Sequence, residues 1–326
     1  TAGRKNPDSA LFPYYTDDKI QDNAEITGSK TVLLVGKNDK IYLWEPFSFR
    51  YDGIYKIERK CYKNIYGNKL IFKEINYDLQ VTFQYGWFNS EKYGFIKKST
   101  IINLSDQSVL INILDGIQNI LPYGIGQKFQ NDFSTLTDAY KKNELDSETG
   151  LGIYSLSSIP VDKAEPSEAL KATIVWSTGI SSDKILISSG QIDSFRKGIP
   201  VKQENDIRAT RGAYLINSKI DLASGNYKTW YIVSEIEQDS KDIITIKKLL
   251  NENQKLEQKL ENDIARGTDN LFCKVAKSDG IQKTADTLNT SRHFSNVLFN
   301  IMRGGIFIDD YKIDKQDFLQ FLFDSN

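Results

Sequence analysis

Histidine and cysteine, the side chains that most often act as a base, a nucleophile or a metal ligand, are scarce in this chain. The one histidine, His293, lies in a late helical pattern, and Cys61 and Cys273 stand far apart in the sequence. A Ser-His-Asp or Cys-His arrangement therefore has no histidine within the β-patterned region, and a two-histidine zinc site is excluded. The two cysteines form neither a disulfide framework nor a metal-ligand cluster, and we expect Cys61 to be a small buried residue. The sequence predicts no catalytic residue, no metal site and no cofactor.

Carboxylates are too numerous to mark a catalytic pair by their proximity alone. Acid–base chemistry often uses two carboxyl groups, but the chain has 43 Asp and Glu residues. One tight acidic cluster surrounds Pro166 and consists of Asp162, Glu165 and Glu168. We interpret it as a turn whose carboxylates favour the N-terminus of a short helix through the helix dipole, in preference to a metal or acid–base site.

A long alternation of apolar and polar residues over residues 70–88 is the strongest structural pattern. Alternate side chains of a strand point to opposite faces, so the pattern predicts an antiparallel strand with one apolar face. We expect Tyr77, Tyr85 and Trp87, on that face, to belong to the core, and we expect Trp44, Trp176 and Trp230 to be packed as well. The alternation is longer than a usual strand, so it either bends across a very large sheet or breaks into two strands.

The rest of the chain divides into three regions by its periodicity. Residues 1–30 are polar and are expected to form an extended N-terminal arm that is not part of the core. Residues 31–237 are expected to form a β domain, interrupted by one amphipathic helix over residues 129–145. Residues 238–326 have helical spacing, and the last clear helix, residues 285–303, ends at Gly304 and Gly305. Its apolar stripe is expected to be buried and consists of Phe294, Val297, Leu298 and Ile301.

The overall composition excludes several classes of partner. With 42 basic and 43 acidic side chains the net charge is −1, which gives no electrostatic reason to expect a nucleic acid or an anionic membrane. No apolar run approaches the roughly 20 residues that span a bilayer. The chain begins with Thr1 and has Met302 as its one methionine, so we interpret it as a processed or cut fragment. The compartment stays open: a cytoplasmic protein is favoured over a processed or exported bacterial one.

An ordered set of short stretches carries a family resemblance. The stretches are residues 59–64, 67–68, 85–87, 114–116, 119–122 and 161–168. Together they resemble the N-terminal domain of large glycoside phosphorylases and hydrolases of the cellobiose phosphorylase type, over about residues 41–307. The resemblance implies a mainly β fold, a two-sheet antiparallel super-sandwich similar to galactose mutarotase, followed by an α-helical linker segment. In that family an (α/α)6 catalytic barrel comes next.

The resemblance implies a domain without the catalytic acid, since in that family the acid lies in the helical barrel. The mutarotase route also needs histidine in the sandwich, and His293 lies outside it. We therefore expect a non-catalytic domain of a carbohydrate-active enzyme, with the C-terminal barrel of the same polypeptide as partner and an oligosaccharide or a homodimer as further candidates. Two alternatives remain open: a stand-alone carbohydrate-binding β-sandwich module that uses exposed rings, and a structural or partner-binding β protein.

The polar stretch of residues 115–122 is the candidate contact site within the β domain. Its Asp-Gly pair and its amides follow an apolar strand, so we expect a turn that faces a neighbouring domain or a glycan, although such residues are also ordinary turn formers. The candidate contact residues, for a glycan or for the barrel, are Asp115, Gln118 and Asn119.

Overall fold

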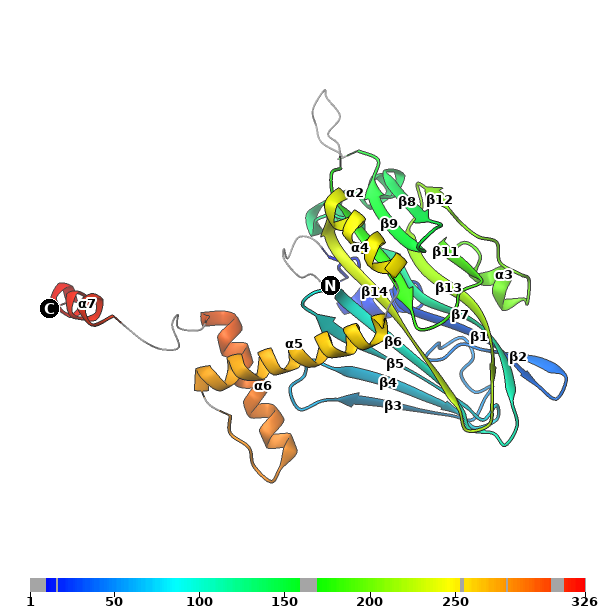
Figure 1. Ribbon diagram of the computed structural model, residues 1–326, viewed down its shortest axis with the longest axis horizontal. Coiled ribbons are helices and arrows are strands. Elements are labelled where there is room, and N and C mark those ends of the chain that lie inside the picture. The colour runs from blue at the N-terminus through cyan, green and yellow to red at the C-terminus, as the bar shows by residue number, and fades with distance from the viewer. Residues whose placement is uncertain are drawn as a thin grey trace.

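Two antiparallel sheets followed by helices make up the fold, which confirms the predicted mainly β sandwich with a helical segment after it (Figure 1). The computed structural model describes residues 10–15, 17–158, 169–252, 255–279, 281–305 and 314–325. The acidic cluster of Asp162, Glu165 and Glu168 lies outside the described residues. The division of the chain into an arm, a sandwich domain and a linker domain stays a prediction.

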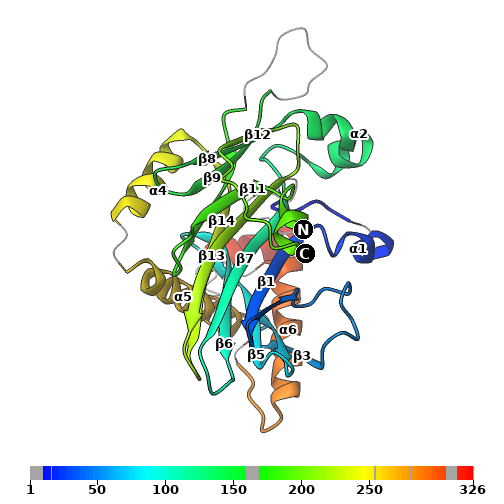
Figure 2. The same cartoon turned by 90° about the vertical axis from the view of Figure 1, so that its right-hand side faces the viewer.

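The smaller sheet has five strands and the larger has nine, and the two have different strand orders. The five-stranded sheet, in spatial order, consists of β11 (Lys184–Ser188), β13 (Gly212–Leu222), β7 (Val109–Ile120), β1 (Gly28–Lys37) and β2 (Lys40–Trp44). The nine-stranded sheet, in spatial order, consists of β12 (Asp206–Arg208), β8 (Lys141–Asp146), β9 (Leu151–Leu156), β10 (Ala172–Thr178), β14 (Tyr227–Gln238), β6 (Gly94–Asn103), β5 (Val81–Ser90), β4 (Leu70–Asn76) and β3 (Ile57–Lys63). Figure 2 shows β13, β7 and β1 side by side.

Both faces of the central strands are covered, and their side chains alternate accordingly. In β14, Trp230 and Ile232 point into the core between the sheets, whereas Tyr231 and Val233 point to the outer face. That outer face packs against helix α5 (Leu256–Asp279) and is joined at its margin by α4 (Ser240–Glu252). Because a strand is hydrophobic on each face that it buries, the sequences of these strands are nearly continuous runs of apolar residues. The outer face of the five-stranded sheet is covered by the short helix α3 (Ile192–Arg196).

The long alternating pattern breaks into two strands, β4 and β5, which pair with each other as a hairpin. The turn between them contains Gln80 in the left-handed backbone region, with φ 56°. Tyr77 lies in this turn and is exposed, so its expected place in the core is wrong. Tyr85 and Trp87 are half-buried and pack against the core between the sheets. The predicted burial of the other three tryptophans is confirmed for Trp44, Trp176 and Trp230.

The N-terminal segment enters the core, contrary to expectation. Leu11 is fully buried between the sheets, and its carbonyl accepts a hydrogen bond from the backbone N–H of Leu121 at 2.9 Å. Phe12 packs edge-on against Trp87, with ring centroids 6.0 Å apart. Helix α1 (Asp17–Asn23) follows and leads into β1. A segment of few apolar residues thus contributes one buried leucine and one half-buried aromatic ring to the core.

Two further local expectations are wrong. Helix α2 (Gln127–Ala139) ends early, and the remainder of the expected helix forms β8, because Leu145 belongs to the core between the sheets. Cys61 is exposed, since it lies on β3 at the edge of the nine-stranded sheet, and Cys273 is exposed as well. Both thiols are free.

Of the helices that follow the sandwich, α5 packs on the large sheet, the next helix packs on α5, and the last helix has no buried residue. Helix α6 (Thr287–Gly304) begins at the N-cap Asp286 and ends before Gly305, whose φ of 78° suits glycine. Its stripe packs against α5 and the β3–β4 turn, which confirms the expected burial for Phe294 and Val297, whereas Leu298 and Ile301 are half-buried. Phe294 lies against Tyr66 with ring centroids 5.0 Å apart. Helix α7 (Lys315–Ser325) has no buried residue. None of the helices in the described part of the chain is long and apolar enough to span a bilayer.

The buried and exposed aromatic residues of α6 provide a stability test. We predict that Phe294→Ala lowers the free energy of unfolding by about 3–5 kcal/mol, because it empties a site between α6, α5 and Tyr66. Phe299→Ala, on the same helix with 51% of its side chain exposed, is the matched control and should change it by less than about 0.5 kcal/mol. Urea denaturation followed by circular dichroism measures both. Equal effects of the two variants would show that the packing of α6 is wrong.

Candidate functional site

Asp115 lies in the interior of the sandwich and not in a turn. Strand β7 runs on to Ile120, so the expected turn at this stretch is wrong. The side chain points between the two sheets and is 0% exposed. Its neighbours along the same face of β7 are Ile113 and Ile117, which belong to the main core.

The Asp115 carboxylate is fully partnered by side chains from both sheets. Its Oδ1 accepts hydrogen bonds from the ammonium of Lys97 and the hydroxyl of Thr31, both at 2.6 Å. Its Oδ2 accepts from the indole N–H of Trp230 at 2.7 Å and from the hydroxyl of Ser99 at 3.1 Å. A buried charge is tolerated when it is paired and hydrogen-bonded in this way. With these donors in place, both carboxylate oxygens are hydrogen-bonded inside the fold.

Lys97 is buried as completely as its partner. Its ammonium also donates to the carbonyl of Gly116 at 3.0 Å and lies 5.5 Å from the centre of the Tyr85 ring. Burial lowers the pKa of Lys97, and the neighbouring Asp115 charge only partly opposes the shift. Gly116 is required here by packing: a Cβ at this position would lie 1.8 Å from the carbonyl oxygen of Tyr214.

Gln118 and Asn119 lie at the far end of β7 and have different surroundings. The Gln118 amide donates to the carbonyl of Glu25 at 2.7 Å and accepts from Ser189 at 3.3 Å, so it ties the loop before β1 to β7. Asn119 is an extra residue in β7, because Gln118 pairs with Ala213 while Ile120 pairs with the preceding Gly212. This β-bulge places Asn119 in the left-handed region with φ 57°.

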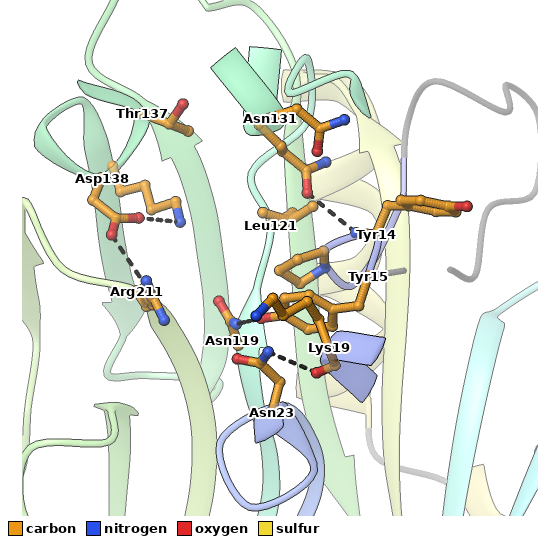
Figure 3. Close-up of a pocket in the computed structure, with 13 residues that line it drawn as sticks. Tyr14, Tyr15, Lys19, Asn23, Asn119, Leu121, Asn131, Thr137, Asp138 and Arg211 are labelled. Carbon is orange, nitrogen blue, oxygen red and sulfur yellow. Dashed lines mark hydrogen bonds and ion pairs between the residues drawn. The ribbon is translucent and has the colours of Figure 1, made fainter. Parts of the chain in front are cut away.

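The bulged Asn119 lines the pocket that is drawn in Figure 3. The pocket has a volume of about 470 Å³ and is open to the surface. Its walls come from the N-terminal segment and α1, from α2, and from the start of β8 and β13. The lining residues are Pro13, Tyr14, Tyr15, Lys19, Asn23, Asn119, Leu121, Gln130, Asn131, Thr137, Asp138, Lys141 and Arg211.

One wall of the pocket carries a charged cluster. The Asp138 carboxylate accepts from the Lys141 ammonium at 2.6 Å and from Nε of Arg211 at 3.2 Å. Burial lowers the pKa of Lys141, although the hydrogen bond to Asp138 opposes the shift. The opposite wall carries Tyr14 and Tyr15 (Figure 3). The pocket thus combines aromatic rings, amides and paired charges, a lining that suits a polar, hydroxylated ligand.

Of the three candidate residues, the structure places only Asn119 in this pocket. The other lining groups were not predicted, since the N-terminal segment, β8 and the start of β13 meet only in the folded sheet system. Arg211 stands directly before an apolar strand in the sequence, which was the one local signal available. The described residues contain no group of three or more His, Cys, Asp or Glu side chains that could hold a metal ion.

A second buried charge cluster fastens α3 to the five-stranded sheet. Glu45 follows β2, is 2% exposed, and pairs with Arg196 of α3 at 2.5 Å and with Lys30 of β1 at 2.8 Å. Lys30 also pairs with Glu25 at 2.7 Å. Burial alone would raise the pKa of Glu45, but the hydrogen bond from Arg196 and the charge of Lys30 outweigh it and hold this pKa below its ordinary value of 4.5.

Comparisons with known proteins give similarity of fold at low sequence identity. No family model matches the chain, and no curated protein matches it. A bacterial glucoamylase complexed with acarbose is 11% identical with a TM-score of 0.46, and the match covers 82% of this chain and 34% of that one. A protein described as a kojibiose phosphorylase from the human microbiome is 12% identical with a TM-score of 0.35, covering 82% and 28%. A galactose mutarotase-like protein from Clostridium acetobutylicum is 10% identical with a TM-score of 0.30, covering 69% and 83%.

The chain spans about a third or less of the length of the first two of these structures.

The buried pair gives a prediction with an internal check. We expect Asp115→Ala to lower the free energy of unfolding by about 3–5 kcal/mol, because it leaves the Lys97 ammonium buried without a counter-charge. The double variant Asp115→Ala, Lys97→Met should be more stable than the single variant, since no uncompensated charge remains. Urea denaturation measures both, with Asp221→Ala, on an exposed position of β13, as control. A single variant within 1 kcal/mol of the wild type would contradict the arrangement.

The Glu45 cluster predicts how stability depends on pH. The pKa of Glu45 in the folded protein is lowered. Its contribution to the free energy of unfolding is therefore complete above pH 4.5 and is lost as the pH falls through the pKa of the folded protein. We expect the free energy of unfolding of the wild type to fall steadily below pH 4.5 and that of Glu45→Gln to fall less steeply. Urea denaturation at several pH values between about 3 and 7 measures this. Parallel pH profiles for the two proteins would show that the ion pairs with Lys30 and Arg196 are not formed.

Proposed function

We propose that this chain is a non-catalytic β-sandwich domain of a carbohydrate-active enzyme, a glycoside phosphorylase or hydrolase. Its role is to support a helical catalytic barrel of the same polypeptide and to contribute to the surface near the bound glycan. The proposal starts from the sequence resemblance and from a fold of the kind that this resemblance implies, a two-sheet sandwich with helices packed on one outer face.

The observation that carries the proposal is an uncovered apolar face on the last helix, α7. Phe318, Phe321 and Leu322 lie three and four residues apart and therefore on one face, with exposed fractions of 48%, 65% and 42%. Large apolar side chains gathered on the surface mark an interaction site, because their contact with water is unfavourable. Helices that follow the sandwich and present such a face are suited to pack against the first helices of a barrel.

The ionisable groups of the sandwich support a structural role. A general acid for glycosidic cleavage needs a carboxyl group whose pKa is raised. Several carboxyl groups of the described residues have a pKa below the ordinary value, because hydrogen bonds and basic neighbours outweigh burial where burial is present; these groups are Glu25, Glu45, Glu58, Asp146, Asp193, Asp206, Asp239, Glu261 and Asp263. Such groups stay ionised at neutral pH and do not donate protons.

The stand-alone binding module is the second candidate, and the tryptophans weigh against it. Such a module uses exposed rings as stacking platforms, but Trp44, Trp176 and Trp230 are buried and Trp87 packs against Phe12. The polar pocket around Asn119 is the feature that favours some contact with an oligosaccharide. A homodimer that uses the apolar face of α7 is a further proposal of the same kind.

An activity assay tests the non-catalytic role. We expect the purified chain to release neither glucose nor glucose 1-phosphate from cellobiose or maltose, and to leave the mutarotation rate of fresh α-glucose at its background value. Enzymatic glucose detection and polarimetry measure these quantities. Turnover that disappears when a carboxylate of the sandwich is replaced would overturn the proposal.

The coding sequence provides an independent test of the partner. We expect the reading frame to continue past Asn326 into a region with the helical-hairpin repeat of an (α/α)6 barrel. A reading frame that stops there would leave the apolar face of α7 without the proposed partner and would favour the module or the homodimer.

A further inference from the structure

We propose that the pocket around Asn119 is a subsite for one neutral glycosyl unit of an oligosaccharide, held by a sugar hydroxyl that donates a hydrogen bond to the Asn119 side-chain oxygen. This proposal deepens the proposed function and rests on it for the class of ligand. The pocket volume of about 470 Å³ lies within the roughly 300–1,000 Å³ of ligand sites.

The first observation is a buried acceptor without a partner. The Nδ2 of Asn119 donates to the hydroxyls of Tyr15 and Thr27, both at 3.0 Å. Its Oδ1 is buried, and no described residue donates a hydrogen bond to it. Asn119 as a whole is 3% exposed. Because a buried acceptor left unpaired is costly, this oxygen is suited to accept a hydrogen bond from a ligand in the pocket.

The second observation is the backbone that holds this amide. Asn119 is the extra residue of a β-bulge and has a φ of 57°, a region that residues other than glycine seldom adopt. In a regular strand its side chain would alternate with those of Gln118 and Ile120. The bulge instead turns it into the pocket, as Figure 3 shows, with its oxygen directed away from Tyr15. Strained bulges that aim a buried polar group at a pocket are typical of binding sites.

The surrounding groups select a neutral hydroxylated ligand over an anion. The basic side chains of the pocket already have acidic neighbours: Lys141 and Arg211 share Asp138, and Lys19 lies 3.9 Å from Asp22. An ionised carboxylate also has no proton to offer to the Asn119 oxygen. A sugar hydroxyl can donate to that oxygen and accept from the two terminal nitrogens of Arg211. The hydrogen bond of Arg211 to Asp138 uses Nε instead. The ring of Tyr15 offers an apolar surface for the face of the sugar ring.

Ligand titration of the full chain tests the proposal. Maltotriose and cellotriose are the neutral probes and inorganic phosphate is the anionic probe, each followed by saturation-transfer NMR and calorimetry. Two variants address the pocket: Asn119→Gly, which keeps the left-handed backbone at little steric cost, and Arg211→Gln. Asn38→Gly is the matched control, because Asn38 also has a positive φ, is exposed, and lies in the turn at the opposite end of β1.

We expect at least one trisaccharide to bind, with a Kd about tenfold higher for Asn119→Gly and several-fold higher for Arg211→Gln, and an unchanged Kd for Asn38→Gly. Arg211→Gln keeps the test valid if Asn119→Gly proves unstable by thermal unfolding. No saccharide binding, binding that neither pocket variant weakens, or binding of phosphate in place of saccharide would each overturn the proposal. The same samples are assayed for turnover: an inactive chain that fails to bind removes this subsite alone, whereas an active chain overturns the proposed function itself.

Discussion

A single carboxylate sealed between two sheets constrains this structure more than any other group. Asp115 is reached by donors from β1, β6 and β14, so its four hydrogen bonds connect both sheets at one point. An ion in a dry interior tolerates little displacement of its partners, because each lost hydrogen bond leaves a charge without solvation. The register of β7 against its neighbours is therefore held by polar chemistry as well as by apolar packing. The bulge at Asn119 lies four residues further along the same strand, where its position depends on that register.

Much of the fold could be predicted from periodicity, and the errors of that prediction have a common origin. Alternation identifies a strand but does not reveal where the chain reverses direction, and the pattern continues through the β4–β5 turn because Leu79 is buried there as it would be in a strand. A side-chain hydrogen bond closes this turn, from the backbone N–H of Leu79 to Asn76 at 3.0 Å. The burial of Leu11 and the exposure of Cys61 depend on which strands form the sheet edges. The residues next to them in the sequence do not indicate where those edges lie.

The candidate site could be predicted only in part for a similar reason. Asn119 was identified as a polar residue after an apolar run, but its special backbone arises from pairing with β13, which follows more than ninety residues later. The same rule selected Asp115, where it gave a turn that does not exist. Local polarity thus locates groups that need a partner. It does not distinguish a partner within the fold, such as Lys97, from one that must come from solution.

The insertion of Leu11 has a consequence for synthesis of the chain on the ribosome. Leu11 leaves the ribosome before Leu121, whose backbone binds it and emerges 110 residues later. At about 5–20 residues per second the segment waits roughly 5–20 s before its site exists. During this time it carries few apolar residues that could aggregate, which suits a segment that must stay unfolded and soluble. This segment is thus made before its docking site and reaches the core only after β7 has formed.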